Sequence, residues 1–498
     1  MSVSGVEIRE TGTITEIKRG VVKLAGLPGC ILGQLIELGH GARGFVIGFT
    51  DSEVLALTLG YDAELAVGQQ VEVRQHPLRI PAGAALLGRM VSPLGEPLDG
   101  EPAPAGEAMR AMFQEAPGIM ARNPVERQLR TGINAIDAMI PVGRGQRELI
   151  IGDRMTGKTA LALDAILNQH DQGVLCIYCS IGQSQQKLQQ VRRLLEERQA
   201  SRYTIIVAAP ASCEASEQFL APYAACAIGE HFMEQGRDVL VVFDDLSKHA
   251  WAYRQLSLLL ERSPGREAYP GDMFYIHAQL MERAGQLDQP RGGGSMTFLP
   301  ICETQQGDVT GYISSNLISM TDGQIYLSTA LFYEGVKPAV DVGLSVSRIG
   351  NKVQLPLLRW VSGSLRLEFL QHQERRKLAR FAGSASAQAA QRHQHGLLLR
   401  RLMVQPAHRP IAYADQVMLF YAFKTGWLDR LTEEGLRICF DGLAGRLPSF
   451  AKEALASNEA LTPALHAKLE AGLEEVLRLY CRPDGEANAL AEAASGRP

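Results

Sequence analysis

Apolar and polar residues alternate in short runs over the first 75 residues, and glycines separate these runs. The segments "TGTITEI", "GVVKLAGL", "GFVIGF" and "VEVRQ" have the period of two that is typical of strands with one buried face. Several short strands of this kind, joined by tight turns, predict a small antiparallel β-barrel over residues 1–75.

Strand and helix patterns then alternate over residues 76–355, which predicts a mostly parallel sheet with helices packed on it. After "LPLLRW" the strand signals stop and helical spacing takes over, so residues 356–498 are predicted to form a helical domain. Its clearest stripe is Leu461, Leu465, Leu469, Leu473 and Leu477, and the final "PDGEANALAEAASGRP" is predicted to be a frayed tail. The predicted fold is therefore a multidomain α/β protein with a barrel, a nucleotide-binding domain and a helical domain.

Composition narrows the function. The chain has 498 residues, too many for one core, and a net charge of −4 with acids and bases intermixed. This mixture argues against nucleic acid as a partner. No apolar run reaches the roughly 18 residues that cross a bilayer. The eight cysteines are scattered except for "CIYC", which lies in a predicted strand, so buried reduced thiols are favoured over a zinc or redox motif.

The segment "GDRMTGKT", residues 152–159, has the spacing G-x-x-x-x-G-K-[ST] of a phosphate-binding loop. An apolar strand precedes it and an apolar helix follows, which is the context that the motif requires. The alternative is a plain glycine turn between a strand and a helix. Such a loop directs backbone N–H groups and a helix N-terminus toward a polyphosphate, with Lys158 on the outer phosphates and Thr159 on Mg²⁺. The candidate nucleotide-binding residues are Gly152, Asp153, Arg154, Met155, Thr156, Gly157, Lys158 and Thr159.

A second acidic group is expected at the end of a neighbouring strand, where it holds Mg²⁺ directly or through water. In "DVLVVFDDLSK", Asp244 is the first polar residue after an apolar strand. The alternative is a helix N-cap or turn role, and Asp245 is the second choice for the metal.

Hydrolysis also needs a group that activates water near the outermost phosphate, commonly a carboxylate. The strand "GVLCIYCS" runs into "IGQSQQKLQQ", which places Gln183 at the strand end that faces the phosphates. Glutamine can hold a water molecule but cannot accept its proton. The sequence therefore predicts a site that binds ATP or ADP with Mg²⁺ and hydrolyses ATP poorly.

Over nearly its whole length the chain resembles the alpha subunits of F-type ATP synthases. The resemblance is carried by "GDRMTGKT", "RTGINAIDAMIPVGRGQRELIIGD", "VVFDDLSKHAWAYRQLSLLLERSPGREAYPGD", "GGGSMTFLPICETQQGDVTGYISSNLISMTDGQIYL" and "DVGLSVSRIG". In that family a glutamine in "IGQ" marks the non-catalytic alpha subunit, whereas the beta subunit carries the catalytic glutamate.

The resemblance implies an alternating hexameric ring with beta subunits, around a gamma rotor and held by peripheral stator subunits. The resemblance also implies that the rotor and the stator subunits connect this ring to a membrane sector. That sector would translocate protons or sodium ions during ATP synthesis or hydrolysis. The implied location is peripheral, on the cytoplasmic face of a bacterial or archaeal cell membrane, with "SPGREAYPGD" facing the rotor. The barrel pattern begins almost at the first residue, which resembles the alternate, sodium-linked F-type ATPases.

Arg348 ends the run "VGLSVSR" and matches the family arginine that reaches into the beta subunit's catalytic site. A guanidinium suits this role because it stays charged and donates in a fixed fork. Such a residue supplied in trans is worth roughly 10³ to 10⁵ in rate in other phosphoryl-transfer proteins. The alternative is an arginine that caps a strand or pairs with an acid.

Three positions depart from the family pattern. Met155 replaces a glutamine in the phosphate loop, Lys337 replaces an arginine before Pro338 near the adenine, and Ala407 replaces the second adenine-side glutamine. Gln405 matches the first adenine-side glutamine of the family. Fewer polar contacts to the base predict weaker or less base-selective nucleotide binding.

Other classes of protein share parts of this pattern. A secretion-type or flagellar export ATPase would need a glutamate at position 183. A ring-shaped RNA translocase would need a basic, aromatic surface on the barrel, where the sequence has few aromatic residues and no basic cluster. A purely structural ring subunit without nucleotide is the third alternative, which the thinned adenine contacts leave open.

Overall fold

The computed structural model describes residues 10–18, 20–39, 42–59, 65–379, 387–456 and 460–482. Internal contacts divide the chain into two compact units. The first is formed within residues 1–125, 144–154 and 169–322. The second is formed within residues 126–143, 155–168 and 323–498.

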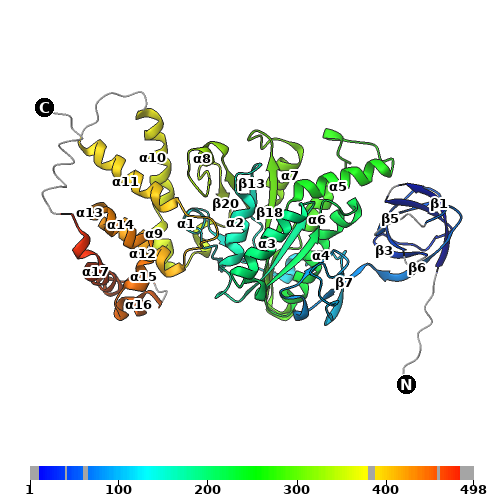
Figure 1. Cartoon of the computed structure of the whole chain (residues 1–498), viewed down its shortest axis with the longest axis horizontal. Coiled ribbons are helices and arrows are strands. Elements are labelled where there is room, and N and C mark those ends of the chain that lie inside the picture. Colours follow the sequence, from blue (N-terminus) through cyan, green and yellow to red (C-terminus); the bar gives the residue numbers. More distant parts are fainter. Residues whose placement is uncertain are drawn as a thin grey trace, which may run out of the picture. The chain divides into compact units, whose positions relative to one another are not determined.

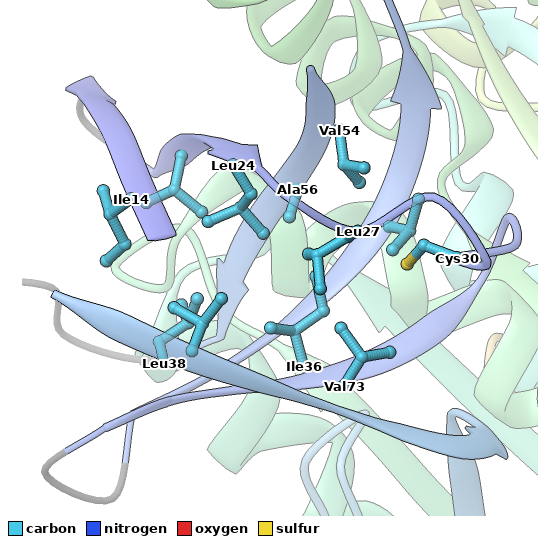
Figure 2. Packing of buried hydrophobic residues seen from close by; sticks show 12 residues of the cluster. Ile14, Leu24, Leu27, Cys30, Ile36, Leu38, Val54, Ala56 and Val73 are labelled. Carbon is cyan, nitrogen blue, oxygen red and sulfur yellow. The ribbon is translucent and has the colours of Figure 1, made fainter. Parts of the chain in front are cut away.

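The amino-terminal strands of the first unit close into a barrel with the order β1-β2-β5-β4-β3-β6 (Figure 1). Every neighbouring pair is antiparallel, and buried positions alternate along β3 as the period of two predicts. Figure 2 shows Ile14, Leu24, Ile36 and Val73 pointing into a common apolar core. The strands are β1 (Glu10–Lys18), β2 (Val21–Ala25), β3 (Gln34–Gly39), β4 (Ala42–Phe49), β5 (Val54–Leu59) and β6 (Gln70–Pro77).

The rest of the first unit is built on parallel strands in the order β13-β18-β16-β14-β15-β8. Strands β14 and β15 are buried at every position, as is typical of parallel strands covered on both faces. The bounds are β8 (Met90–Val91), β13 (Leu149–Asp153), β14 (Val174–Ile181), β15 (Thr204–Ala209), β16 (Asp238–Asp244) and β18 (Ser295–Thr304).

Helices follow the strands of this sheet in the chain. They are α3 (Gln185–Glu197), α4 (Ala215–Glu234), α5 (Leu246–Leu259), α6 (Met273–Met281) and α7 (Tyr312–Met320). Four short strands complete the first unit: β7 (Arg79–Ala82) pairs with β9 (Ala108–Ala111), and β10 (Arg122–Asn123) with β17 (Gly285–Leu287). This alternation of strand and helix is the α/β pattern that the sequence predicts.

The second unit is mostly helical, and its carboxyl-terminal helices are yellow to red in Figure 1. On α17 the leucines at 465, 469, 473 and 477 are all buried, which confirms these four positions of the predicted stripe. Leu461, its fifth member, lies before the first turn of α17 and is half-buried. The main helices are α1 (Asn134–Met139), α2 (Lys158–Leu167), α8 (Thr329–Tyr333), α9 (Pro356–Ser362), α10 (Leu365–Ala379), α11 (Ala387–Met403), α12 (Tyr413–Lys424), α13 (Trp427–Arg430), α14 (Glu433–Phe440), α15 (Leu443–Arg446), α16 (Ser449–Ala456) and α17 (Pro463–Leu477). Its strands are β11 (Gln128–Leu129), β12 (Val142–Gly143), β19 (Gly323–Leu327) and β20 (Val346–Ser347).

The predicted fold class is confirmed by the barrel, the mostly parallel sheet and the carboxyl-terminal helices. The domain boundaries at residues 75 and 355 stay a prediction, and the predicted frayed tail, residues 483–498, lies outside the described residues. Within the described ranges, no helix is both long and apolar enough to span a membrane.

The cysteines are all unbridged, as predicted. Six of them are buried, including Cys176 and Cys179 of the "CIYC" segment on β14. Burial raises the pKa of the Cys226 thiol to about 12, so this thiol stays protonated near neutral pH. The prediction of burial is wrong for Cys213 and Cys481, which are half-buried and lie in connecting segments outside the helices and strands.

Candidate functional site

The phosphate-loop sequence connects β13 to α2, as the motif predicts. Gly157 precedes α2 with φ 99°, a conformation that side chains rarely adopt. Nothing lies within 4 Å of a Cβ built on Gly157, so backbone conformation and not space favours glycine there. Met155 also has a positive φ, 62°, and is 90% exposed. The loop thus presents backbone and a thioether, where the family usually has a glutamine amide.

The residues that enter the loop are fixed by the neighbouring strand β18. The carboxylate of Asp153 accepts hydrogen bonds from Oγ1 of Thr304 at 2.7 Å and from the backbone N–H of Gly307 at 2.8 Å. Arg154 is exposed, and its Nε lies 3.6 Å from Oε2 of Glu303. Asp153 therefore has a structural role at the start of the loop, whereas the Arg154 guanidinium is accessible.

Asp244 and Gln183 lie together at the carboxyl ends of adjacent parallel strands. Asp244 ends β16 and is only 1% exposed. Its Oδ1 accepts a hydrogen bond from Nε2 of Gln183 at 2.8 Å, and its Oδ2 accepts one from the hydroxyl of Tyr178 at 2.7 Å. Burial and the charge of Asp244 raise the pKa of Tyr178 well above its usual value, which keeps its hydroxyl a donor. The Asp244 carboxylate is thus held by two neutral donors.

Asp245 has the N-cap role that was the alternative for Asp244. Its carboxylate accepts a hydrogen bond from the backbone N–H of Lys248 at 2.8 Å at the start of α5. Burial, and then the charge of Asp244, raise the pKa of Asp245 to about 7. Because the carboxylate of Asp245 is used at the helix N-terminus, Asp244 is the better candidate of the two for metal binding. The peptide bond between the two aspartates is cis.

Sequence reasoning missed three residues around these groups. Tyr178 reads as a core aromatic residue within an apolar strand, yet it donates to Asp244. The ammonium of Lys187, in the first turn of α3, lies 3.9 Å from Oδ2 of Asp244. Glu303 pairs in register with Gly152 on the neighbouring strand. An acid that directly follows the apolar run "FLPIC" was the available signal for Glu303.

The second unit holds the start of α2 and the predicted base-side residues. Lys158 is 6% exposed and begins α2, followed by Thr159. The backbone N–H of Gln405 donates to the carbonyl of Lys337 at 2.7 Å, and the peptide bond between Lys337 and Pro338 is cis. The structure therefore brings Lys337, Pro338 and Gln405 together.

The side chains of these base-side residues already have partners within the chain. Nε2 of Gln405 donates to the carbonyls of Gly132 and Arg409, each at 2.8 Å, and its Oε1 accepts from the N–H of Asn134 at 3.3 Å. The Lys337 ammonium lies over the Phe332 ring, 4.5 Å from its centre. Both amide hydrogens of Gln405 are thus used to hold the segment that contains it.

Arg348 follows β20 and is exposed. Its neighbour Ser347 is fixed by donating a hydrogen bond to the carbonyl of Pro141 at 2.8 Å. Among the described residues, Arg348 has no carboxylate within ion-pair distance. The ion pair that was the alternative reading of Arg348 is thus not formed within the described part of this chain.

The chain has a phosphate-loop sequence directly after a strand of a parallel sheet, and on the same sheet a buried strand-end carboxylate with a glutamine beside it. These features define the class of P-loop nucleotide-binding folds. Residues 132–347 match the family model described as the ATP synthase alpha/beta family, nucleotide-binding domain, and residues 354–478 match the ATP synthase alpha/beta chain, C terminal domain. The chain belongs to the ATP synthase alpha/beta family. The predicted resemblance to F-type ATP synthase alpha subunits is confirmed.

A curated relative supports the same assignment. The chain is 45% identical over 478 residues to the ATP synthase subunit alpha of Caldanaerobacter subterraneus subsp. tengcongensis. This alignment covers 95% of the present chain and 94% of the relative. The similarity is therefore chain-long, whereas membership of the sodium-linked group stays a prediction.

Proposed function

We propose that this chain is the non-catalytic, nucleotide-binding alpha-type subunit of a rotary F-type ATP synthase. The observation that supports this most strongly is the pair of Gln183 and Asp244. The amide of Gln183 is neutral and donates to Asp244, so it cannot accept a proton from an attacking water molecule. ATP bound by this chain is therefore expected to be held and hydrolysed poorly.

The proposed ligand is ATP or ADP with Mg²⁺. Asp244 fits a metal held through water, because it is a carboxylate at the carboxyl end of a parallel strand, as such a metal requires. The Thr159 hydroxyl is the proposed direct ligand, and the bound Mg²⁺ would neutralise charge on the phosphates. The proposed nucleotide-binding residues are Gly152, Asp153, Arg154, Met155, Thr156, Gly157, Lys158, Thr159, Gln183, Asp244, Lys337, Pro338 and Gln405.

Arg348 is proposed to act in the neighbouring beta subunit. It is exposed, and the described residues of this chain give it no acidic partner, so its charge is available to a neighbour. A guanidinium in that place would stabilise charge on the transferring phosphoryl group. The proposed assembly is an alternating ring with beta subunits around a gamma rotor, peripheral to the cytoplasmic face of the membrane. Stator subunits would connect the ring to the sector that transports protons or sodium ions.

Steady-state hydrolysis of MgATP tests this proposal. We expect no turnover by the chain alone, and turnover by the ring with its beta and gamma subunits. Arg348→Lys should lower the activity of the ring by a factor on the order of 10³. Arg478→Lys, which changes an exposed arginine in the same unit, should leave the activity unchanged. Robust hydrolysis by the isolated chain would mean that Gln183 does not have the role proposed here.

A further inference from the structure

The helical part of the second unit contains a pocket of about 240 Å³. Its lining residues come from α10 and α11, which are labelled in Figure 1, and from Asp429 of α13. This volume holds several water molecules, so a small ion with several oxygen atoms fits within it. Most of the residues that line it are charged or polar, although apolar atoms form the larger part of its wall.

Two arginines of this pocket have no carboxylate partner among the described residues. Arg375 of α10 and Arg392 of α11 both line it, and both are exposed. In the described ranges, Arg375 donates only a long hydrogen bond to the Gln371 amide oxygen at 3.4 Å, and Arg392 has no carboxylate within 4 Å. Two guanidiniums on facing helices therefore have unused donors at one pocket.

The two carboxylates of the pocket lie beside a third basic group. Oδ2 of Asp429 is 2.9 Å from Nδ1 of His395, and Oε2 of Glu368 is 3.9 Å from Nε2 of the same ring. The hydrogen bond that His395 donates to the Asp429 carboxylate raises the pKa of His395. Glu368 and Asp429 therefore face His395, and they do not neutralise the two arginines by an ion pair.

A buried imidazole adds a further polar group to the wall. His372 is 7% exposed, and its Nε2 has no hydrogen-bond partner among the described residues. A Cβ on Gly396 would lie only 1.9 Å from Nδ1 of His372, so the glycine on α11 leaves the space that this ring occupies. Burial, and then the charges of His393 and nearby arginines, lower the pKa of His372. An anion beside these groups would offset that positive field.

We propose that this pocket between α10 and α11 binds a small oxyanion of the phosphate class. Arg375 and Arg392 would donate to its oxygens from opposite sides, and planar guanidiniums match the geometry of a tetrahedral oxyanion with several acceptors. The site is separate from the phosphate loop in sequence and in the chemistry of its donors, which are side chains and not backbone N–H groups.

Titration calorimetry of the full-length chain with inorganic phosphate at fixed ionic strength tests the proposal. Arg375→Gln/Arg392→Gln removes both free guanidiniums. Arg376→Gln/Arg400→Gln is the matched control, because it makes the same charge change on the same two helices where both arginines pair with Glu334. We expect the first double variant to weaken one phosphate-binding event at least about tenfold and the control to retain it. Phosphate binding at the P-loop would be the same in all three proteins.

Equal loss in both double variants would show a general charge effect and overturn the proposal. Unchanged binding in Arg375→Gln/Arg392→Gln, or no saturable phosphate binding by the unaltered protein, would also overturn it. A second titration with glycerol 3-phosphate separates free phosphate from a phosphate monoester as the ligand. Acetate should bind at least about tenfold more weakly than either, since it carries fewer oxygens and a single charge.

Discussion

The side-chain amide of Gln183 donates to Oδ1 of Asp244 across 2.8 Å, and the two residues lie at the ends of adjacent parallel strands, β14 and β16. The other carboxylate oxygen accepts from Tyr178. The neutral amide of Gln183 is therefore a favourable hydrogen-bond partner for the buried Asp244 carboxylate. A carboxylate at position 183 would replace this attraction with repulsion between like charges.

Gln183→Glu is expected to destabilise the protein without nucleotide by about 1–3 kcal/mol, because a buried hydrogen bond to a charged group is lost. MgATP should restore part of this loss if a metal near Asp244 offsets the added charge. The midpoint of thermal unfolding, measured with and without MgATP, checks both expectations. Gln185→Glu is the control, since Gln185 is exposed and lies two residues further along the chain, at the start of α3. Equal midpoints for the two variants would contradict the prediction.

Local patterns in the sequence predict the elements of this fold because burial repeats with the period of each element. The alternation along β3 and the leucine stripe of α17 are examples. The partners of Asp244 depend instead on the register of strands far apart in sequence. Tyr178 is 66 residues from Asp244 and lies in a run that is otherwise apolar, so its hydroxyl gives no local signal.

The base-side residues also have hydrogen-bond partners that local sequence patterns do not predict. The match of Gln405 to a family position suggests an amide that contacts a base. Whether that amide is free depends on Gly132 and Arg409, which approach it only in the folded chain. Sequence predicts the residue types at such a site, whereas the hydrogen bonds that occupy them follow from tertiary structure.

The buried ion pair of Arg283 and Glu230 gives a second prediction. The guanidinium donates two hydrogen bonds to the carboxylate, at 2.6 and 2.7 Å, and both side chains are almost fully buried. Glu230→Gln leaves the positive charge of Arg283 buried without a charged partner, which is expected to cost about 3–5 kcal/mol. Urea unfolding of the first unit, followed by tyrosine fluorescence, measures this loss.

The double variant Glu230→Leu/Arg283→Met is the control for this charge effect. It removes both charges and keeps apolar volume, so it should be more stable than Glu230→Gln. If the double variant is as unstable as the single one, packing and not the unpaired charge explains the loss. The double variant also loses the hydrogen bond that Arg283 donates to the carbonyl of Met112. The loss of this bond sets the smallest decrease in unfolding free energy that is expected for the double variant.

Two buried histidines predict sensitivity to acid. Nε2 of His249 lies 3.1 Å from the carbonyl of Phe219, and its Nδ1 lies 3.2 Å from Nε2 of His277. A carbonyl accepts only from a protonated nitrogen, so His249 carries its hydrogen on Nε2 and accepts from His277 with Nδ1. Burial lowers the pKa of His249 to about 4 and that of His277 well below its usual value.

Because both histidines are neutral in the folded chain, protons bind to the unfolded chain first as pH falls below about 6.5. Stability should therefore be fully present above that pH and decrease toward pH 4, by about 3 kcal/mol for His249 alone. Thermal midpoints at a series of pH values between 7.5 and 4.5 check the sign. His249→Gln should flatten the decrease, and His170→Gln, at an exposed position, should not. An unchanged slope in His249→Gln would contradict the assignment.

The thinned base-side contacts give the last prediction, which concerns nucleotide choice. Gln405 uses both amide hydrogens within the chain, and Ala407 offers only a methyl group where the family usually has an amide. We therefore expect the chain to bind MgATP and MgGTP with dissociation constants that differ by less than about tenfold, since each unmade polar contact forfeits about 1 kcal/mol or more of discrimination. Ala407→Gln should increase the preference for adenine, whereas Ala471→Gln on α17 is the control at an exposed helical position.

Calorimetric titrations of the unaltered chain and the two variants with MgATP and MgGTP measure the ratio of the two dissociation constants. A strong preference for adenine in the unaltered chain would show that other groups read the base. The absence of binding by either nucleotide would favour a purely structural ring subunit.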